Sequence, residues 1–309
     1  MSLLAGAHVA PRRSSRSGSR LRTHLWGYLF IAPWLFGFLV FTLGPFVASF
    51  YLGFTRWGLL DTPVFIGLRN YWDLVHDYLF IKSLINTAYY TAFHVPLSML
   101  LAFLLALLLN QRIRGIPIYR TLFYLPSITA SVATAILWVY LLQPDGIVNA
   151  VLAHVGIAGP PWLADSFWAM PSLILISLWS IGGTMIIYLA GLQGVPQHLY
   201  EAAVIDGAGR WQKALHVTVP MMTPTILLTA ILGVIGSFQV FDNAFIITAG
   251  GPANATLVYI LLLYQNAFEY FKMGYAAAMA WVLFLIVLVV TLIQLRVART
   301  WVYYESEQK

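Results

Sequence analysis

The sequence predicts an all-α membrane protein with six transmembrane helices, and two observations carry that prediction. Of the 309 residues, 60% are hydrophobic and only 9% are charged, whereas an ordinary soluble domain is about 45–50% apolar and about 25% charged. A water-soluble fold of this length has no core large enough to bury so much apolar surface. The apolar residues also gather into six runs of about 20 residues or more, the length that a helix needs to cross a bilayer.

The six runs favour helices over the strands of a barrel, because they are continuous and show no alternation of polar and apolar residues. Lipid offers no hydrogen-bond partner to the backbone, so each run must satisfy its own peptide groups. The expected spans are 25–50, 87–109, 122–142, 168–191, 221–247 and 275–295. Within these runs the one Asp, Glu, Lys or Arg is Asp242, in the fifth.

The basic residues predict the orientation of the chain. Of the 17 Lys and Arg residues, 13 lie in the two tails and in the connections 110–121 and 192–219, and four lie in the remaining connections. Because Lys and Arg accumulate on the cytoplasmic side of a membrane, both termini are expected in the cytoplasm. The net charge of +6 is then a topology signal and not a sign of nucleic-acid binding.

The N-terminal tail is similar to the basic region of a signal peptide, since five Arg residues precede the first apolar run. That run is far longer than the roughly 7–15 apolar residues of a secretory signal, so an uncleaved first span is expected. The chain therefore divides into a basic tail (1–24), a six-span domain (25–297) and a C-terminal tail (298–309). The lack of cysteine excludes disulfides and thiolate metal sites.

The connection 192–220, between the fourth and fifth runs, contains a predicted short helix. Pro196 suits the first turn of a helix, and few helix breakers follow between Leu199 and Asp206. Gly207 is a natural stop, because glycine adopts the left-handed conformation without strain. A helix of about ten residues results, which is marginally stable alone in water.

Two interpretations of this helix stay open. Ala202, Ala203 and Ala208 present a nearly smooth surface that another protein can approach closely. The alternative is an amphipathic helix resting on lipid headgroups, a role that favours a polar face rich in Lys and Arg. Because the helix carries Glu201 and Asp206 instead, docking to a protein is the favoured interpretation.

This loop also carries a family resemblance. Its run Glu-Ala-Ala-Val-Ile-Asp-Gly-Ala at 201–208, followed by Trp211-Gln212 and Thr218-Val219-Pro220, resembles the EAA loop of ABC importer permeases. The form is that of the binding-protein-dependent sugar permeases related to the maltose and glycerol-phosphate systems. Three further segments resemble the same subfamily: 120–126, 189–196 and 248–252. Gly209 and Ala214 depart from the family pattern, which often has Ser and Phe there.

The resemblance implies an ABC importer type I permease fold and a permease subunit that is not itself an enzyme. In this family the loop forms a coupling helix that sits in a groove on a cytoplasmic ATPase. The residues that carry this role over to the present chain are Glu201, Ala202, Ala203, Asp206, Gly207 and Ala208.

The same resemblance implies the partners of the chain and its cellular location. They are a second, homologous permease chain, two ATPase subunits, an extracytoplasmic solute-binding protein and a carbohydrate, in the inner membrane of a bacterium or archaeon. The ATPases would bind ATP and Mg²⁺, because this chain lacks the phosphate loop Gly-x-x-x-x-Gly-Lys-Ser/Thr. No cofactor is expected on the chain itself.

Asp242 is the first candidate for contact with the solute, because acids within membrane spans are costly and usually functional. Gln239, Asn243 and Phe238 offer the planar polar groups and the aromatic face that sugars bind, and Trp179 is a further candidate on the path. The alternative is that these side chains, like His94 in the second run, only pack helices together.

Interruptions in the runs also have two interpretations. Pro33 and Pro45, the segment 94–96 with Pro96, Gly182-Gly183, and Gly233 with Gly236 indicate either close packing and kinks or bends around a solute path. Close packing is the favoured interpretation.

Three other classes of protein compete with the importer subunit. A secondary transporter driven by an ion gradient would favour several intramembrane charges and inverted repeats, whereas the runs hold a single acid. An intramembrane enzyme would need a motif such as His-Glu-x-x-His or Gly-x-Ser-x-Gly, and neither occurs. A membrane scaffold gives no reason for the loop at 201–208.

Overall fold

The computed structural model describes residues 16–111 and 114–303, with the side chains of residues 16–26 left out of the description. The chain divides into two units, Met1–Tyr51 and Leu52–Lys309. The basic tail predicted at 1–24 falls largely outside the described residues, as do Arg112 and Lys309.

The first unit is one long helical run. It consists of α1 (Arg16–Phe38), a π turn η1 (Leu39–Leu43) and α2 (Gly44–Leu52), and the apolar stretch Gly27–Leu52 is long enough to cross a membrane. The Gly44 N–H donates to the Leu39 carbonyl, five residues back. Pro45 follows at once and has no N–H to donate, so the wider π turn lies where the regular α-helical ladder is interrupted. The predicted first span is therefore helical throughout.

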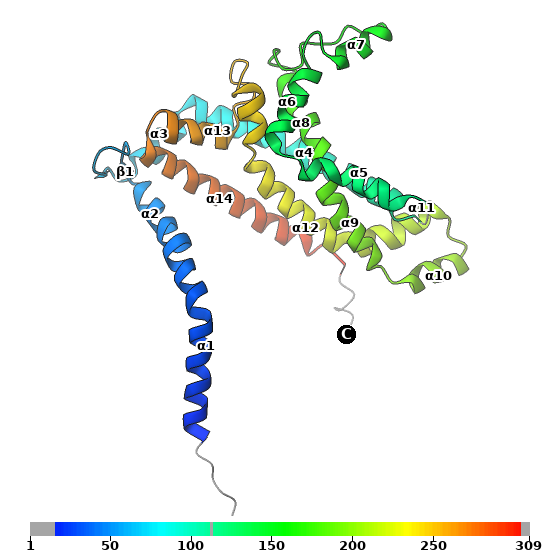
Figure 1. Cartoon of the computed structure of the whole chain (residues 1–309), viewed down its shortest axis with the longest axis horizontal. Coiled ribbons are helices and arrows are strands. Elements are labelled where there is room, and N and C mark those ends of the chain that lie inside the picture. Colours follow the sequence, from blue (N-terminus) through cyan, green and yellow to red (C-terminus); the bar gives the residue numbers. More distant parts are fainter. Residues whose placement is uncertain (1–15, 112–113, 304–309) are drawn as a thin grey trace, which may run out of the picture. The chain divides into compact units, whose positions relative to one another are not determined.

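The second unit carries the remaining spans and their connections (Figure 1). In chain order its elements are β1 (Thr55–Arg56), β2 (Val64–Phe65), α3 (Arg69–His76), α4 (Tyr78–Leu109), α5 (Ile116–Ile128), α6 (Ser131–Leu141), α7 (Ile147–His154), α8 (Ala169–Ser177), η2 (Leu178–Ser180), α9 (Gly182–Gln193), α10 (Gln197–Ile205), α11 (Arg210–Lys213), η3 (Ala214–Thr218), α12 (Val219–Phe238), η4 (Ala244–Thr248), α13 (Tyr259–Tyr264), η5 (Gln265–Glu269) and α14 (Met273–Ala298). The two short strands pair antiparallel, with Thr55 opposite Phe65.

Four of the described helical stretches are long and apolar enough to cross a membrane, and the number rises to six if each of two bent pairs is one span. The straight spans are Gly27–Leu52, Tyr78–Leu109, Arg210–Phe238 and Met273–Ala298. The bent pairs are α5 with α6, at 96°, and α8 with α9, at 48°. The mostly helical, six-span fold class is confirmed.

Three sequence expectations about these spans need correction. The second span begins at Tyr78 and not at 87, and Pro96 lies inside the unbroken α4. The fifth span does not run to residue 247, because α12 ends at Phe238 and residues 239–241 are not helical. Asp242 therefore lies beyond the end of the span and not within it. Hydropathy alone missed this end, because Gln239, Asp242 and Asn243 are interspersed with apolar residues that continue to Ile247.

The core of the second unit is built around α4, which packs against α9 and α12. Small residues allow the close approach: Ala102 and Ala106 of α4 are fully buried beside Met185 and Met222. Polar pairs inside the bundle satisfy each other, as where Tyr188 Oη and Thr229 Oγ1 lie 2.7 Å apart. Such pairs join spans in lipid, where water cannot satisfy a hydroxyl group.

Candidate functional site

The predicted loop helix is α10, and the residues at its two ends are the proline and the glycine that the sequence predicts there. Pro196 is the N-cap, one position before the first turn in which it was expected. Gly207 has φ +77°, the left-handed conformation. Its N–H donates to the Val204 carbonyl at 3.0 Å, and the Ala208 N–H donates to the Ala203 carbonyl at 2.8 Å. These two bonds satisfy carbonyls at the end of α10, as a glycine C-cap does.

The six predicted coupling residues lie together on α10 and the turn that follows it, and none of them is buried. The same segment exposes apolar side chains that sequence reasoning did not select. Ile205 is 86% exposed and Trp211 is 82% exposed. Exposed apolar side chains of this size are consistent with contact to another protein or to lipid, the two interpretations that the sequence leaves open.

The loop is joined to the fifth span by a side-chain hydrogen bond and by the continuous chain. Tyr200 Oη of α10 lies 3.0 Å from Thr218 Oγ1 of η3. The Gly209 N–H donates to Gln212 Oε1 at 2.7 Å and so caps the start of α11. From Arg210 to Phe238 the chain is one helical stretch of 29 residues, which at 1.5 Å per residue spans about 44 Å. One helical stretch therefore runs from the turn after α10 to the far end of α12.

A polar cavity of about 400 Å³ lies at that far end. Gln239, Asp242 and Asn243, three of the predicted path residues, line it together with Phe241. Hydroxyl groups from the two bent spans also line it, beside a few apolar residues: Ser127, Thr129, Ser131, Thr134 and Ser180. Sequence reasoning missed these hydroxyls, although four of them crowd into residues 127–134 of an otherwise apolar run.

A second polar cavity of about 350 Å³ adjoins the first, since Ser180 and Asn243 line both. It also contains His94, Ser98, Ser177, Thr184 and Thr229. His94 Nδ1 lies 2.8 Å from Ser177 Oγ, so this histidine joins α4 to α8 and faces the cavity as well. Among the residues that line the two cavities, Asp242 is the one carboxylate and there is no Lys or Arg.

The other two predicted path residues lie elsewhere. Phe238 is 7% exposed and belongs to the hydrophobic core. Trp179 lines a separate, mostly apolar cavity with leucines of α4. Its ring packs edge-on against Trp138, with the centroids 5.9 Å apart. Among the described residues no group of three or more His, Asp or Glu side chains is placed to hold a metal ion.

The interruptions noted in the sequence are explained in part by packing. A Cβ at Gly182 would collide with the Phe123 carbonyl of α5, whereas a Cβ at the adjacent Gly183 would meet nothing within 4 Å. A Cβ at Gly233 would lie 3.2 Å from Val95, whereas one at Gly236 would again lie in open space. Gly182 is thus required for close packing against α5, and Gly233 gives a tight approach that a small shift of the Val95 side chain could relieve.

Comparisons with known proteins agree with this architecture. Residues 94–302 match the family described as "Binding-protein-dependent transport system inner membrane component". The chain is 43% identical to the probable ABC transporter permease protein YesP of Bacillus subtilis, over 95% of this chain and 97% of the relative. It is 37% identical to the lactose transport system permease protein LacF of Rhizobium radiobacter, over 93% and 98% of the two chains.

A solved structure shares the fold. It is a chain of a bacterial ABC transporter involved in the import of the acidic polysaccharide alginate, with a TM-score of 0.82 and 24% sequence identity. The match covers 93% of this chain and 99% of that one. The matching family and the relatives of 37% and 43% identity are transport-system permeases of the ABC type, which disfavours the alternative of a secondary transporter driven by an ion gradient. The chain therefore belongs to the family of binding-protein-dependent transport system inner membrane components, the permease subunits of ABC importers.

Proposed function

We propose that this chain forms one half of the membrane path for a carbohydrate and couples that path, through α10, to a separate cytoplasmic ATPase. One observation carries the proposal. A single helical stretch, Arg210–Phe238, connects the exposed surface around α10 to the polar cavity at Gln239, Asp242 and Asn243. Coupling requires an element that two sites bias together, and this stretch touches both.

The chemistry of the cavities suits an uncharged, polyhydroxylated solute. Amides, hydroxyls and one carboxylate offer donors and acceptors to sugar hydroxyl groups, and Phe241 offers an aromatic face. Without a Lys or Arg in their lining, the two cavities have no counter-ion for a phosphate or a uronate. Several relatives are named for sugar transport, as LacF is for lactose. The proposed solute is therefore a neutral sugar or oligosaccharide.

The proposed assembly contains a second permease chain of the same family, two ATPase subunits that hold ATP and Mg²⁺, and an extracytoplasmic solute-binding protein. Both termini face the cytoplasm of a prokaryotic inner membrane. The exposed surface of Glu201, Ile205 and Trp211 is the part of this chain that would sit in the groove of an ATPase. Asp206 and Gly207 would hold the turn that follows α10.

The test is gentle affinity purification of the chain from its native membrane, with mass spectrometry of the proteins that accompany it. We expect an ATPase with a phosphate loop and a second six-span permease chain. The same preparation, reconstituted with its binding protein, should hydrolyse ATP faster when a neutral sugar is present. A chain that is recovered alone or as a homodimer in several mild detergents would contradict the proposal.

A further inference from the structure

The short helix α3 directly precedes a membrane span in the chain. Asp77 is the one residue between its end at His76 and the start of the span α4 at Tyr78. With each bent pair counted as one span, three spans separate α3 from α10, so the two helices lie on opposite sides of the membrane. In the proposed orientation α3 is therefore on the outer side.

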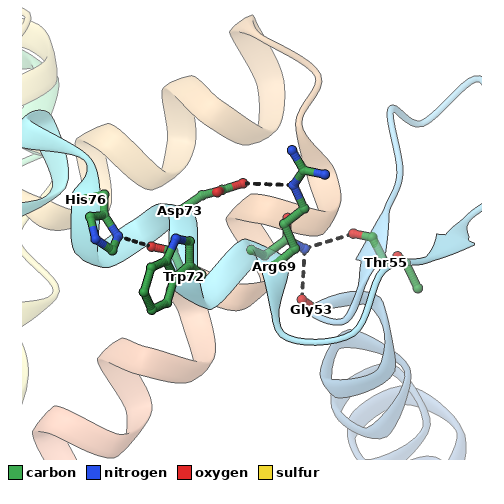
Figure 2. Close-up of polar contacts among 7 residues, drawn as sticks. Gly53, Thr55, Arg69, Trp72, Asp73 and His76 are labelled. Atoms are coloured by element: carbon green, nitrogen blue, oxygen red, sulfur yellow. Dashed lines mark hydrogen bonds and ion pairs between the residues drawn. The ribbon is translucent and has the colours of Figure 1, made fainter.

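One side of α3 is fixed to the protein. Asn70 and Leu74 are buried, at 6% and 1% exposure. Asn70 Nδ2 donates to the carbonyls of Gly53 and Thr55, at 2.9 Å each, which ties α3 to the start of the β-hairpin (Figure 2). These contacts set the rotation of the helix about its own axis.

The remaining surface of α3 divides into two flanks. Arg69 and Asp73, four residues apart, form an ion pair with 4.0 Å between Nε and Oδ2. Asp73 also lines a polar cavity of about 720 Å³ that contains Arg56, Asp61 and Lys272, so this flank is hydrophilic. Figure 2 shows the Trp72 ring on the other side of the helix from the ion pair.

The second flank is apolar and exposed. Leu68, Trp72 and Val75 are 68%, 67% and 58% exposed. At 100° per residue they fall within about 60° of one another, opposite the buried Asn70 and Leu74. The exposed apolar surface continues along the chain into α4 at Tyr78, Ile81 and Ile85, which are 72%, 45% and 59% exposed. The flank is thus an extension of the apolar surface of a span.

We propose that α3 is an interfacial anchor, with Leu68, Trp72 and Val75 inserted among the lipids of the outer leaflet and the Arg69–Asp73 pair facing water. Trp is enriched at this depth because its ring is apolar and its N–H is polar. The Trp72 ring lies against the His76 ring, 4.5 Å between centroids, and the His76 Nδ1 lies 2.8 Å from the Trp72 carbonyl. Arg69 and Asp73 carry opposite charges side by side, so we expect insertion to depend mainly on apolar burial.

The absence of cysteine allows a direct test, since a single introduced cysteine is the one labelling site on this chain. Trp72→Cys and the adjacent Asp73→Cys are labelled with an environment-sensitive fluorophore. The whole importer complex is then reconstituted in vesicles of phosphatidylcholine, with and without phosphatidylglycerol. Quenching is measured with iodide from the water and with a nitroxide on the lipid chains. Val75→Cys repeats the measurement with Trp72 in place.

We expect the lipid nitroxide to quench the label at positions 72 and 75 at least about twofold more than at position 73, and iodide to show the reverse order. The order should not depend on phosphatidylglycerol. Equal access of iodide to positions 72 and 73 would overturn the proposal. Labels at 72 and 75 shielded from both quenchers would also overturn it, since a protein would then cover this flank. Sugar uptake by the unlabelled variants is measured separately and tests the proposed function, not the anchor.

Discussion

At the scale of single residues, Asp242 lines the cavity through which the proposed solute would pass. The carboxylate lies just beyond α12, in a cavity otherwise lined by neutral groups. A charged acceptor makes stronger hydrogen bonds with sugar hydroxyl groups than an amide does. In the proposed path it would also disfavour anionic solutes, because no cation in the lining of the two cavities offsets a negative charge there.

Asp242→Asn is therefore expected to weaken solute contact without affecting insertion. A hydrogen bond to a charged group contributes about 1.5–3 kcal/mol, and Asn keeps part of it, so the KM for uptake should rise roughly tenfold. The measurement is sugar uptake by the reconstituted complex with its binding protein in excess. Asp145→Asn is the control, because Asp145 is exposed and lines neither cavity. Equal KM values for the two variants would show that Asp242 does not contact the solute.

Gly207 shows how a single backbone conformation supports the coupling helix. Because its φ is +77°, a side chain there is strained by about 1 kcal/mol or more. Gly207→Ala should lower sugar-stimulated ATP hydrolysis relative to Gly209→Ala. Gly209 has φ −71°, and its added Cβ would meet Gln212 Oε1 at an ordinary 3.6 Å. The measurement is the ratio of sugar-stimulated to basal ATPase activity in each variant. An unchanged ratio in both variants would show that the turn at Gly207 does not contribute to coupling.

At the scale of elements, the bent spans build the cavity. The chain is extended at Thr129 between α5 and α6, and it passes through the 3₁₀ turn Leu178–Ser180 between α8 and α9. Both breaks contribute hydroxyl side chains to the cavity, Thr129 and Ser180 among them. Irregular backbone in a membrane is tolerated where it lines a cavity of this kind.

The contact between the two bent spans gives a prediction with an internal control. Gly182→Ala places a Cβ against the Phe123 backbone, which cannot move as a flexible side chain would, so we expect a cost of about 1–3 kcal/mol. Gly183→Ala should be nearly neutral, because its Cβ enters open space. Thermal unfolding of the two purified complexes in one detergent compares them. Equal midpoints would mean that α5 and α9 do not pack closely in the assembled importer.

These elements also show how far sequence reasoning reaches. Continuous apolar runs predicted where the helices cross the membrane, and Gly207 predicted where α10 stops, because both signals are local. The breaks at Thr129 and Phe238 were missed, because the polar residues beside each break are outnumbered by apolar ones, and tertiary packing decides which of these places ends the helix. The neighbours of Asp242 were missed for the same reason, since the hydroxyls of residues 127–134 reach it only after the chain has bent.

At the scale of the whole molecule, the orientation in the membrane decides whether the parts can work together. The proposed coupling surface must face the ATPase in the cytoplasm, and the loop between β1 and β2 must face outward. Two exposed apolar residues report on this, Leu60 at 93% and Ile205 at 86% exposure. Because the chain has no cysteine of its own, each position can be labelled alone.

In intact spheroplasts, a membrane-impermeant maleimide should react with the Leu60→Cys variant and not with the Ile205→Cys variant. Permeabilised spheroplasts should expose the second site, and co-expression of the partner ATPase should then protect it, because the ATPase groove covers α10. Labelling of both sites from outside would mean that an even number of spans lies between them, so that one bent pair does not cross the membrane. Labelling of position 205 alone from outside would mean that the chain has the opposite orientation in the membrane. In both of these arrangements α10 would lie outside the cell and could not contact a cytoplasmic ATPase.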